Sequence, residues 1–134
     1  MAATLVDSNV LLDVLTDDQD WGDWSAAMLE EAAESGALVI NPIIYAEVSV
    51  RFDAIEALEE ALPAGYFTRA ALPWEAAFLA AKCFVRYRKR GGASVRTLPD
   101  FFIGAHAAVA GLTLLTRDAR RYRTYFPTLR IVSP

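Results

Sequence analysis

The sequence predicts an α/β fold in which a mostly parallel central sheet lies between layers of helices. Two observations indicate this class. Short apolar runs alternate with longer stretches of helical spacing, which is typical of parallel strands covered on both faces. Of the 134 residues, 54% are hydrophobic and 22% are charged, and no repeat or low-complexity tract interrupts them. We therefore expect a single domain over residues 1–134 with one buried core.

The predicted strands are short runs of Leu, Val, Ile and Ala that are bounded by polar or turn residues. They span residues 3–6, 37–40, 112–116 and 129–132. A further extended segment, 66–72, lies after the break that Pro63 and Gly65 make in the chain. None of the runs approaches the length of about 20 residues that a membrane-spanning helix needs.

Between the strands, the spacing of apolar residues favours helices over 8–16, 21–35, 41–62, 73–90, 98–110 and 119–126. Start and stop signals support several of these bounds. Asp20 is a suitable N-cap for the second helix, and Gly36 lies just past its end. Asn41 followed by Pro42 is a common helix start, so we expect one continuous helix from there to Pro63.

The composition also indicates a compartment. Cys83 is the only cysteine and cannot form an internal disulfide, which fits the reducing cytoplasm. The N-terminus lacks the basic region of a secretory signal, since its first charged side chain is Asp7. We therefore expect a cytoplasmic protein that does not contact membranes.

Charge is distributed unevenly along the chain. Residues 1–63 contain fourteen acids and one base, whereas residues 64–134 contain twelve bases and three acids. The net charge of −4 thus hides a basic half that can meet a polyanion. For any single basic cluster, the alternative is a solvated helix exterior.

Four acids stand where a parallel sheet places its reactive groups. Asp7 comes directly after the first predicted strand, and Asp118 comes shortly after the third. Glu47 and Asp100 fall in the early turns of predicted helices, and Glu47 is surrounded by apolar residues. Because the carboxyl ends of parallel strands share one edge of a sheet, these acids can converge on one cleft.

Each acid also has an ordinary structural explanation. Asp7 and Asp118 can be helix N-caps, and Asp100 can form a capping box with Thr97. Glu47 can form an ion pair with Arg51, four residues further along the helix. One shared explanation accounts for all four acids at once and is therefore favoured.

Clustered carboxylates repel one another unless a cation neutralises them. All-oxygen ligands suit Mg²⁺ or Mn²⁺, whereas zinc prefers histidine and cysteine. His106 is the only histidine, and both it and Cys83 lie inside predicted helices. We expect Cys83 to be buried and His106 to be a core or interface residue. The residues therefore predict a Mg²⁺ (or Mn²⁺) site and no zinc site.

The chain resembles PIN-domain nucleases, and specifically the VapC toxins of bacterial toxin–antitoxin pairs. The resemblance runs nearly end to end. It is carried by "LVDSNVLLDVL", by the acid in "NPIIYAEV", by "LPDFFIGAHAAVAGLTLLTRD" and by the tail "RRYRTYFPTLRIVSP". It implies a Rossmann-like α/β/α sandwich and metal-dependent cleavage of RNA. Matched position by position, it implies a catalytic, metal-binding quartet of Asp7, Glu47, Asp100 and Asp118.

Polar and basic residues around the quartet are expected to assist it. Asn9 and Thr116 match polar positions beside the first and last acid, and with Ser8 they are expected to hydrogen-bond the ligands or the substrate. Basic residues nearby are expected to bind RNA phosphates: Arg86, Arg88, Lys89, Arg90, Arg96, Arg117, Arg120, Arg121 and Arg123. Among them stand three tyrosines that either stack on RNA bases or pack in the core, Tyr87, Tyr122 and Tyr125.

Two partners are implied in addition to RNA. These are a cognate VapB-type antitoxin and a second copy of the chain in a homodimer. Trp21, Trp24 and Met28 share one helix face and are either a groove for the antitoxin or part of the core.

Two other functions fit the sequence less well. A non-catalytic RNA-binding PIN scaffold would usually have lost a member of the quartet, and none is missing here. A haloacid-dehalogenase-type phosphatase also has an aspartate after its first strand, but it needs a second aspartate two residues later. This chain has Asn9 at that position.

Overall fold

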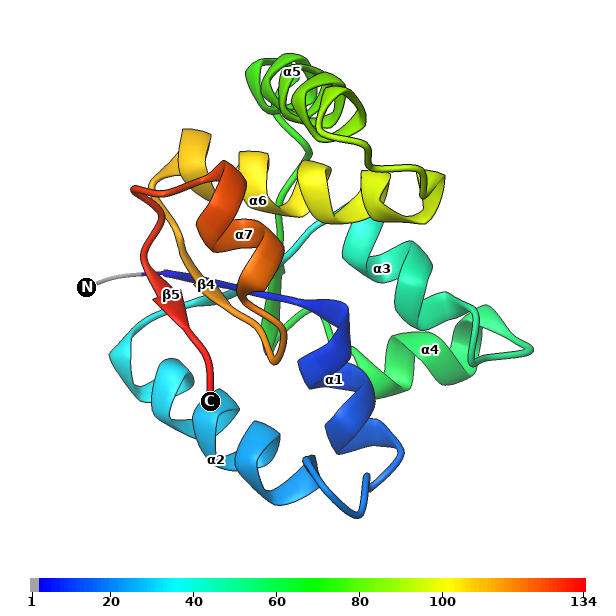
Figure 1. Ribbon diagram of the computed structural model, residues 1–134. Coiled ribbons are helices and arrows are strands. Elements are labelled where there is room, and N and C mark those ends of the chain that lie inside the picture. Colours follow the sequence, from blue (N-terminus) through cyan, green and yellow to red (C-terminus); the bar gives the residue numbers. More distant parts are fainter. Residues whose placement is uncertain (1–2) are drawn as a thin grey trace.

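A computed structural model describes residues 3–134 and contains a five-stranded sheet (Figure 1). The strands are β1 (Thr4–Val6), β2 (Leu38–Ile40), β3 (Phe67–Arg69), β4 (Thr113–Leu115) and β5 (Ile131–Val132). Their order is β3-β2-β1-β4-β5, and every neighbouring pair is parallel. The predicted α/β fold with a mostly parallel sheet is thus confirmed. The extended segment predicted over 66–72 contains β3, which lies at one edge of the sheet.

Helices cover the sheet on both sides. They are α1 (Ser8–Leu15), α2 (Gly22–Ser35), α3 (Pro42–Ser49), α4 (Ile55–Ala61), α5 (Trp74–Lys89), α6 (Leu98–Ala110) and α7 (Arg120–Tyr125), with a short 3₁₀ turn at Val95–Thr97. Figure 1 shows α2 on one side of the sheet and α6 on the other, with α5 packed outside α6. Within residues 3–134, no helix combines the length and the apolar character needed to cross a membrane.

The central strands are buried on both faces, which explains their uninterrupted apolar runs. Leu5 and Val6 of β1 and Leu114 of β4 are fully buried. On α6, Gly104 allows α7 to pack closely, because a Cβ atom there would lie 2.4 Å from the Phe126 ring. This contact packs α7 against α6, and the Tyr122 hydroxyl of α7 reaches Asp7, the residue after β1.

The continuous helix predicted over 41–62 is wrong. α3 ends at Ser49 and α4 begins at Ile55, and the backbone of Ala54 between them is extended. Ser49 Oγ donates to the carbonyl of Tyr45 at 2.6 Å, a local bond that competes with helix continuation. The intervening turn allows Phe52 to pack against the core.

The predicted N-cap of α2 is also wrong. The helix begins after Trp21, which makes no side-chain capping bond, and Asp20 is exposed. Asp18 Oδ1 instead accepts the N–H groups of Asp20 and Trp21, each at 2.9 Å, and so orders the turn that precedes the helix. An aspartate side chain commonly accepts the N–H two residues further on in such a turn.

The carboxyl ends of β1 and β4 meet where the strand order reverses. Val6 is level with Leu115, and the Asp7 N–H donates to the Leu115 carbonyl at 2.9 Å. Asp7 and Thr116 therefore leave the sheet side by side. In open α/β sheets this is the position where ligands bind.

Candidate active site

Asp7 is the most completely hydrogen-bonded acid at this edge. Its side chain is buried, with 4% of the residue exposed. Oδ1 accepts the Ser8 N–H at 2.8 Å, so Asp7 is the N-cap of α1 as one of its two explanations required. Oδ2 accepts the hydroxyls of Thr116 and Tyr122 at 2.8 and 3.0 Å. Three donors thus hold the carboxylate in one orientation.

Two further acids reach the same place from α3 and α6. Glu47 is half-buried, and its Oε1 accepts the Ser8 hydroxyl at 2.8 Å. Asp100, in the first turn of α6, is also half-buried and pairs with Arg121 Nη1 at 2.7 Å. Ser8 therefore links two acids, since its N–H binds Asp7 and its hydroxyl binds Glu47.

The acids affect one another electrostatically. Burial raises the pKa of Asp7, and the negative charge of Glu47 raises it further. Burial likewise raises the pKa of Glu47, and the negative charge of Asp100 adds to this effect. Burial, together with the weaker effect of the Asp7 charge, raises the pKa of Asp100 to about 6, although Arg121 opposes the shift. The charge of Asp118 also raises the pKa of Asp100, so all four predicted acids lie in one electrostatic neighbourhood.

The other ordinary explanations do not describe the structure. Among the described residues Glu47 makes no ion pair with Arg51, and Asp118 does not cap α7, whose N-cap is Ala119 without a side-chain bond. Thr97 makes no side-chain capping bond, because its hydroxyl donates to the Ser94 carbonyl. Asp118 itself is exposed, at the mouth of the site.

A buried ion pair holds the loop between β4 and α7 in place. Arg117 donates to both oxygens of Asp13, each bond being 2.9 Å long, and Asp13 is 2% exposed. The backbone N–H of Arg117 donates to Asn9 Oδ1 at 3.1 Å. Its guanidinium also lies over the Trp21 ring, 5.6 Å from the centroid. Arg117, which the sequence assigns to RNA, is therefore engaged inside the protein.

Sequence reasoning missed Asp13 and underestimated Tyr122. Asp13 lies four residues after Asn9, on the same face of α1, and this spacing beside a predicted site residue is a usable signal. Tyr122 is a sequence candidate for stacking on RNA, but it is 2% exposed and its hydroxyl binds Asp7. The spacing of Tyr122, Tyr125 and Phe126 indicates one buried helix face, and all three are buried.

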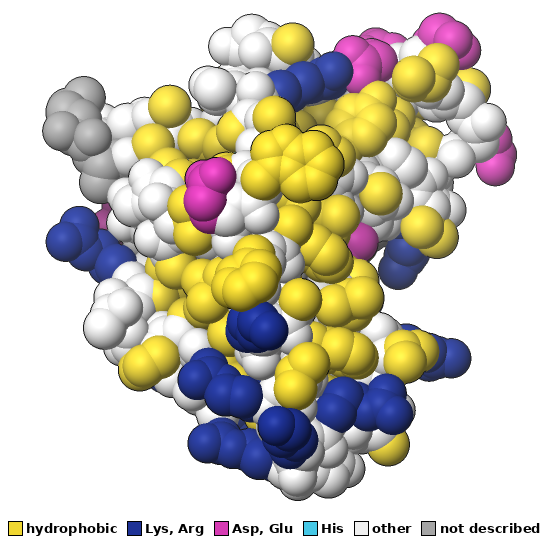
Figure 2. All heavy atoms as spheres, turned by 90° about the horizontal axis from the view of Figure 1, so that it is seen from above, with side chains coloured by type: hydrophobic (Ala, Val, Ile, Leu, Met, Phe, Trp, Pro, Cys, Tyr) yellow, Lys and Arg dark blue, Asp and Glu magenta, His cyan; other side chains and the backbone are white. Residues whose placement is uncertain are grey.

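The remaining basic candidates lie mostly on the surface. Exposed are Arg86, Arg88, Lys89, Arg90, Arg96, Arg120 and Arg123. A cleft of about 510 Å³ beside the acids is lined by Asp118, Arg120, Arg121, Thr124, Tyr87 and Tyr125. Figure 2, which views the molecule from the α5 side, shows Lys and Arg side chains gathered along one border. Arg120 and Arg121, which line the cleft with Asp118, place basic charge next to one of the four acids.

His106 and Cys83 are buried, as expected. His106 Nδ1 lies 2.9 Å from the Nδ2 amide of Asn41, whose Oδ1 accepts the Ile44 N–H and caps α3. The amide must therefore donate, so His106 Nδ1 is an acceptor and the ring is neutral; burial lowers its pKa. Cys83 is 1% exposed in the core. Neither residue contacts the acids.

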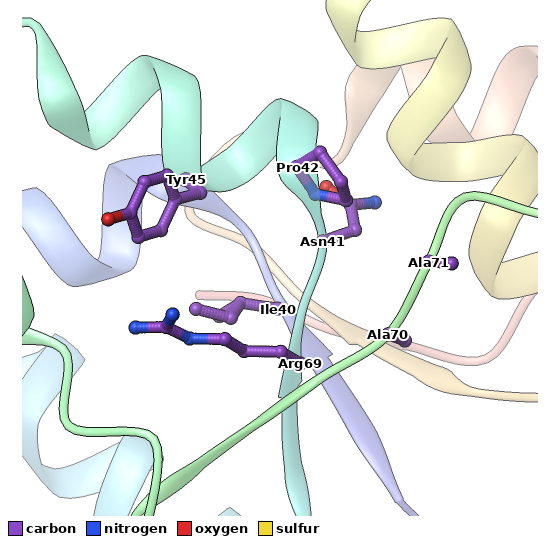
Figure 3. Close-up of a pocket in the computed structure, with 7 residues that line it drawn as sticks. All are labelled: Ile40, Asn41, Pro42, Tyr45, Arg69, Ala70 and Ala71. Carbon is purple, nitrogen blue, oxygen red and sulfur yellow. The ribbon is translucent and has the colours of Figure 1, made fainter.

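A separate pocket of about 320 Å³ opens at the ends of β2 and β3 (Figure 3). Its walls are mostly apolar, and Arg69 lies under the Tyr45 ring, 5.2 Å from the centroid. Glu59 accepts hydrogen bonds from both of these side chains. None of the four acids lines this pocket, so the candidate chemistry belongs to the acidic edge.

The donor set at that edge fits a hard divalent cation, since it consists of carboxylate, hydroxyl and amide oxygens. The charges of neighbouring acids contribute to the raised pKa values of Asp7, Glu47 and Asp100, and a bound cation would offset this repulsion. Within residues 3–134, however, no three side chains of His, Cys, Asp or Glu converge closely enough to enclose an ion. Asp100 Oδ2 accepts a hydrogen bond from Arg121 Nη1.

The raised pKa of Asp100 predicts how the metal-free protein responds to pH. A carboxyl whose folded pKa of about 6 exceeds its ordinary 3.8 contributes stability at low pH, and this contribution is lost as pH rises through about 6. In EDTA, the unfolding temperature of the wild type should therefore fall between pH 4 and pH 7 relative to that of Asp100→Asn. Parallel pH profiles for the two proteins would show that Asp100 carries no such strain.

Comparison with known proteins agrees with this architecture. The family model of the PIN domain matches residues 4–127. The chain belongs to the PIN domain family. No curated protein sequence matches the chain significantly.

Solved structures share the PIN fold of this chain over nearly its whole length. A chain in the crystal structure of VapBC2 from Rickettsia felis, bound to a DNA fragment from their promoter, matches with a TM-score of 0.75 and 16% identity, over 98% of both chains. A chain in the structure of VapBC-1 from nontypeable Haemophilus influenzae matches with a TM-score of 0.73 and 16% identity, over 98% of this chain and 97% of that chain. A chain in the structure of FitAcB from Neisseria gonorrhoeae matches with a TM-score of 0.71 and 18% identity, over 96% of this chain and 95% of that chain.

Proposed function

We propose that this PIN-domain protein is a metal-dependent endoribonuclease toxin that a cognate antitoxin of the VapB type neutralises. The observation that carries the proposal is that Asp7, Glu47 and Asp100 lie near the topological switch point, close enough for their charges to raise one another's pKa values, with basic residues beside them. Membership of the PIN family and the likeness to chains of VapBC complexes support it. The proposed cofactor is Mg²⁺ or Mn²⁺.

The proposed reaction is hydrolysis of an RNA phosphodiester bond. A bound divalent ion supplies Lewis-acid chemistry: it acidifies water and offsets charge on the phosphate. Asp7 and Asp100 would hold the main ion, with Glu47 contributing directly or through water. Asp118, exposed at the mouth of the site, would assist with a second ion or an ordered water.

The neighbouring polar side chains orient these acids. Thr116 and Tyr122 donate to Asp7, and Ser8 donates to Glu47, so their hydroxyls fix where the carboxylate oxygens point. Asn9 acts one step further out. Its amide lies 3.4 Å from the Thr116 hydroxyl, and its oxygen accepts the Arg117 N–H. Thr116 Oγ1 in turn accepts the Asp118 N–H at 3.2 Å.

The proposed substrate path uses the cleft next to the acids. Carboxylates repel RNA at long range, so cations must draw the strand in. Arg120 lines this cleft and is exposed, and Tyr87 forms part of its wall. The exposed bases at the end of α5 would extend the contact to neighbouring phosphates. Arg117 is assigned to the Asp13 pair instead of to RNA.

The proposed function predicts that cleavage depends on metal. The purified protein should cleave single-stranded RNA in Mg²⁺ or Mn²⁺, because the clustered acids need a cation to act together. EDTA should abolish the cleavage, and excess Mg²⁺ should restore it, as measured on a labelled oligonucleotide. Cleavage at full rate in EDTA would exclude this mechanism. RNA binding without cleavage in any metal would favour a non-catalytic scaffold.

The proposed antitoxin site is an apolar groove of about 320 Å³ between α1, α2 and α4. Leu15 and Tyr66 are exposed at its rim, by 38% and 51%. The groove belongs to the acidic half of the chain, so it fits an amphipathic segment with basic flanks. The alternative stripe on α2 is less available, because Trp24 and Met28 pack against the core.

This groove can be tested with the product of a short antitoxin-like reading frame adjacent to that of this protein, where one is present. Asp7→Asn protein should copurify with that product when both are expressed together, and adding Leu15→Asp should abolish the complex by placing a charge in the apolar groove. Val50→Asp is the matched control, since Val50 is 83% exposed and outside the groove. Equal copurification of both variants would move the antitoxin elsewhere.

The proposed homodimer would use α5. Trp74, Phe78 and Val85 share one face of this helix and are 88%, 67% and 47% exposed. Figure 2 shows apolar side chains running across the middle of the face that α5 covers. Large apolar side chains exposed together are typical of an interface, and a second copy presents the same apolar face.

A further inference from the structure

Helix α7 places two consecutive side chains on two different acids of the candidate site. The Tyr122 hydroxyl donates to Asp7 Oδ2 at 3.0 Å. Arg121 Nη1 donates to Asp100 Oδ2 at 2.7 Å. Asp7 and Asp100 are the two carboxylates proposed to hold the main ion. One short helix thus contacts both of them, with a hydroxyl on one and a full positive charge on the other.

The contact between Arg121 and Asp100 is one that a metal ion would replace. A guanidinium and a divalent cation neutralise the same negative charge and draw on the same lone pairs of the carboxylate. The distance of 2.7 Å is that of a strong, charge-assisted hydrogen bond. Asp100 is therefore oriented by an internal cation.

Arg121 has a second place to go within the same cleft. Its guanidinium lies 5.7 Å from the centroid of the Tyr87 ring, and it lines the cleft of about 510 Å³ together with Arg120 and Asp118. The residue is one-third exposed, so solvent reaches it. A guanidinium that leaves Asp100 can stay over Tyr87 and face the cleft, where the phosphates of RNA are proposed to lie.

We propose that Arg121 is an internal counter-ion that neutralises Asp100 until a divalent ion displaces it, and that the displaced guanidinium then binds an RNA phosphate. The inference rests on the proposed metal site and adds a competitor to it. It makes metal binding and substrate binding mutually supportive, because the ion releases the cation that the substrate needs.

The exposure of the pair determines the size of the effect. The ion binds only the fraction of molecules in which the Asp100 carboxylate is free of Arg121. The apparent affinity for the ion is therefore the intrinsic affinity multiplied by that fraction. Ion pairs with one-third of each side chain exposed are modest in strength, so removing Arg121 should tighten Mn²⁺ binding by about fivefold. The gain should shrink at high salt.

The experiment measures Mn²⁺ binding without any catalytic turnover. Free Mn²⁺ is quantified by electron paramagnetic resonance during titration of the wild type, Arg121→Gln and Arg120→Gln, each as the full chain. Arg120→Gln is the matched control. It removes the same charge from the neighbouring residue, which lines the same cleft but forms no ion pair among the described residues. We expect Arg121→Gln alone to bind Mn²⁺ more tightly.

A second measurement covers the case in which Arg121→Gln is destabilised. Without metal its unfolding temperature should lie below that of the wild type, because Asp100 loses its partner, and saturating Mn²⁺ should close the gap. Arg121→Lys keeps a cation at Asp100 and should behave like the wild type in both measurements. Metal-free melting that is equal for the wild type and Arg121→Gln would contradict the pairing.

The outcomes separate this inference from the proposed function. If the wild type cleaves RNA in an EDTA-sensitive manner, but Arg121→Gln binds Mn²⁺ no more tightly, the counter-ion role is overturned and the nuclease stands. Equal gains for Arg120→Gln and Arg121→Gln would also overturn it, since they would reflect general charge alone. If neither the wild type nor Arg121→Gln binds Mn²⁺, and the wild type does not cleave RNA, both proposals fail.

Discussion

Asp7→Asn should abolish RNA cleavage while leaving the fold intact. Asparagine caps a helix about as well as aspartate, so the bond from the Ser8 N–H to the remaining side-chain oxygen persists. The Tyr122 hydroxyl can rotate to accept from the new amide, and the Thr116 hydroxyl can donate to the Asp118 carbonyl, 3.4 Å away, instead. What disappears is a charged oxygen at the centre of the acidic site. Loss of a residue that merely supports a metal ligand costs about 10–100-fold, so we expect at least about a hundredfold loss here.

The unfolding temperature of Asp7→Asn in EDTA distinguishes a ligand from a cap. Burial raises the pKa of Asp7, so the buried charge is a burden on the metal-free protein. Removing that charge should leave the melting temperature in EDTA unchanged or higher. Cleavage in Mg²⁺ and melting in EDTA are measured on the same preparation. A variant that cleaves normally would return Asp7 to the role of a helix cap.

The same substitution at Asp13 should have the opposite effect. Asp13 is buried as deeply as Asp7, but Arg117 neutralises it through two hydrogen bonds, and Ser25 donates to it at 2.7 Å. Asp13→Asn leaves the Arg117 charge without its partner. Breaking such a pair is strongly destabilising; because Arg117 is one-third exposed, we expect a loss of about 2 kcal/mol. This corresponds to a decrease of roughly 5–10 °C in melting temperature.

Together the two variants form a matched pair, since each neutralises one buried aspartate, at the start or in the middle of α1. Below its melting temperature, Asp13→Asn should retain most of its cleavage, because Asp13 is not proposed to bind the ion. The pair is compared by thermal melting and by cleavage well below both transitions. Full stability in Asp13→Asn would mean that the loop after β4 does not depend on the Asp13–Arg117 pair.

Hydrophobic periodicity and sheet topology account for the features that could be predicted from the sequence. Apolar runs without a polar face require burial on both sides, and parallel strands then bring their carboxyl ends together. Asp7 and Thr116 could be expected to meet for this reason, and they do. Capping chemistry is similarly visible at Asn41, whose side chain accepts the Ile44 N–H.

The rest depends on distances that spacing alone does not contain. Asp20 is a suitable cap by its position, but the path of the loop leaves it exposed and brings the Asp18 side chain to the N–H groups before α2. Arg117 and Arg121 look like neighbouring RNA contacts in the sequence. In the structure Arg117 pairs with Asp13 and Arg121 pairs with Asp100, and both acids lie far away along the chain. Which cation meets which acid is fixed by how α1, α6 and α7 pack, not by local sequence.

The strand order has a consequence for how the protein comes into being. Asp7 is made almost at once, but the groups that orient it come from Thr116 and Tyr122, which lie 109 and 115 residues further along. β1 can pair with β2 early, whereas its other edge stays open until β4 has been synthesised. A nascent chain that ends at α6 therefore lacks Thr116, Asp118 and Tyr122. Any activity that needs these residues together arises only in the nearly complete polypeptide, after contacts of high sequence separation have formed.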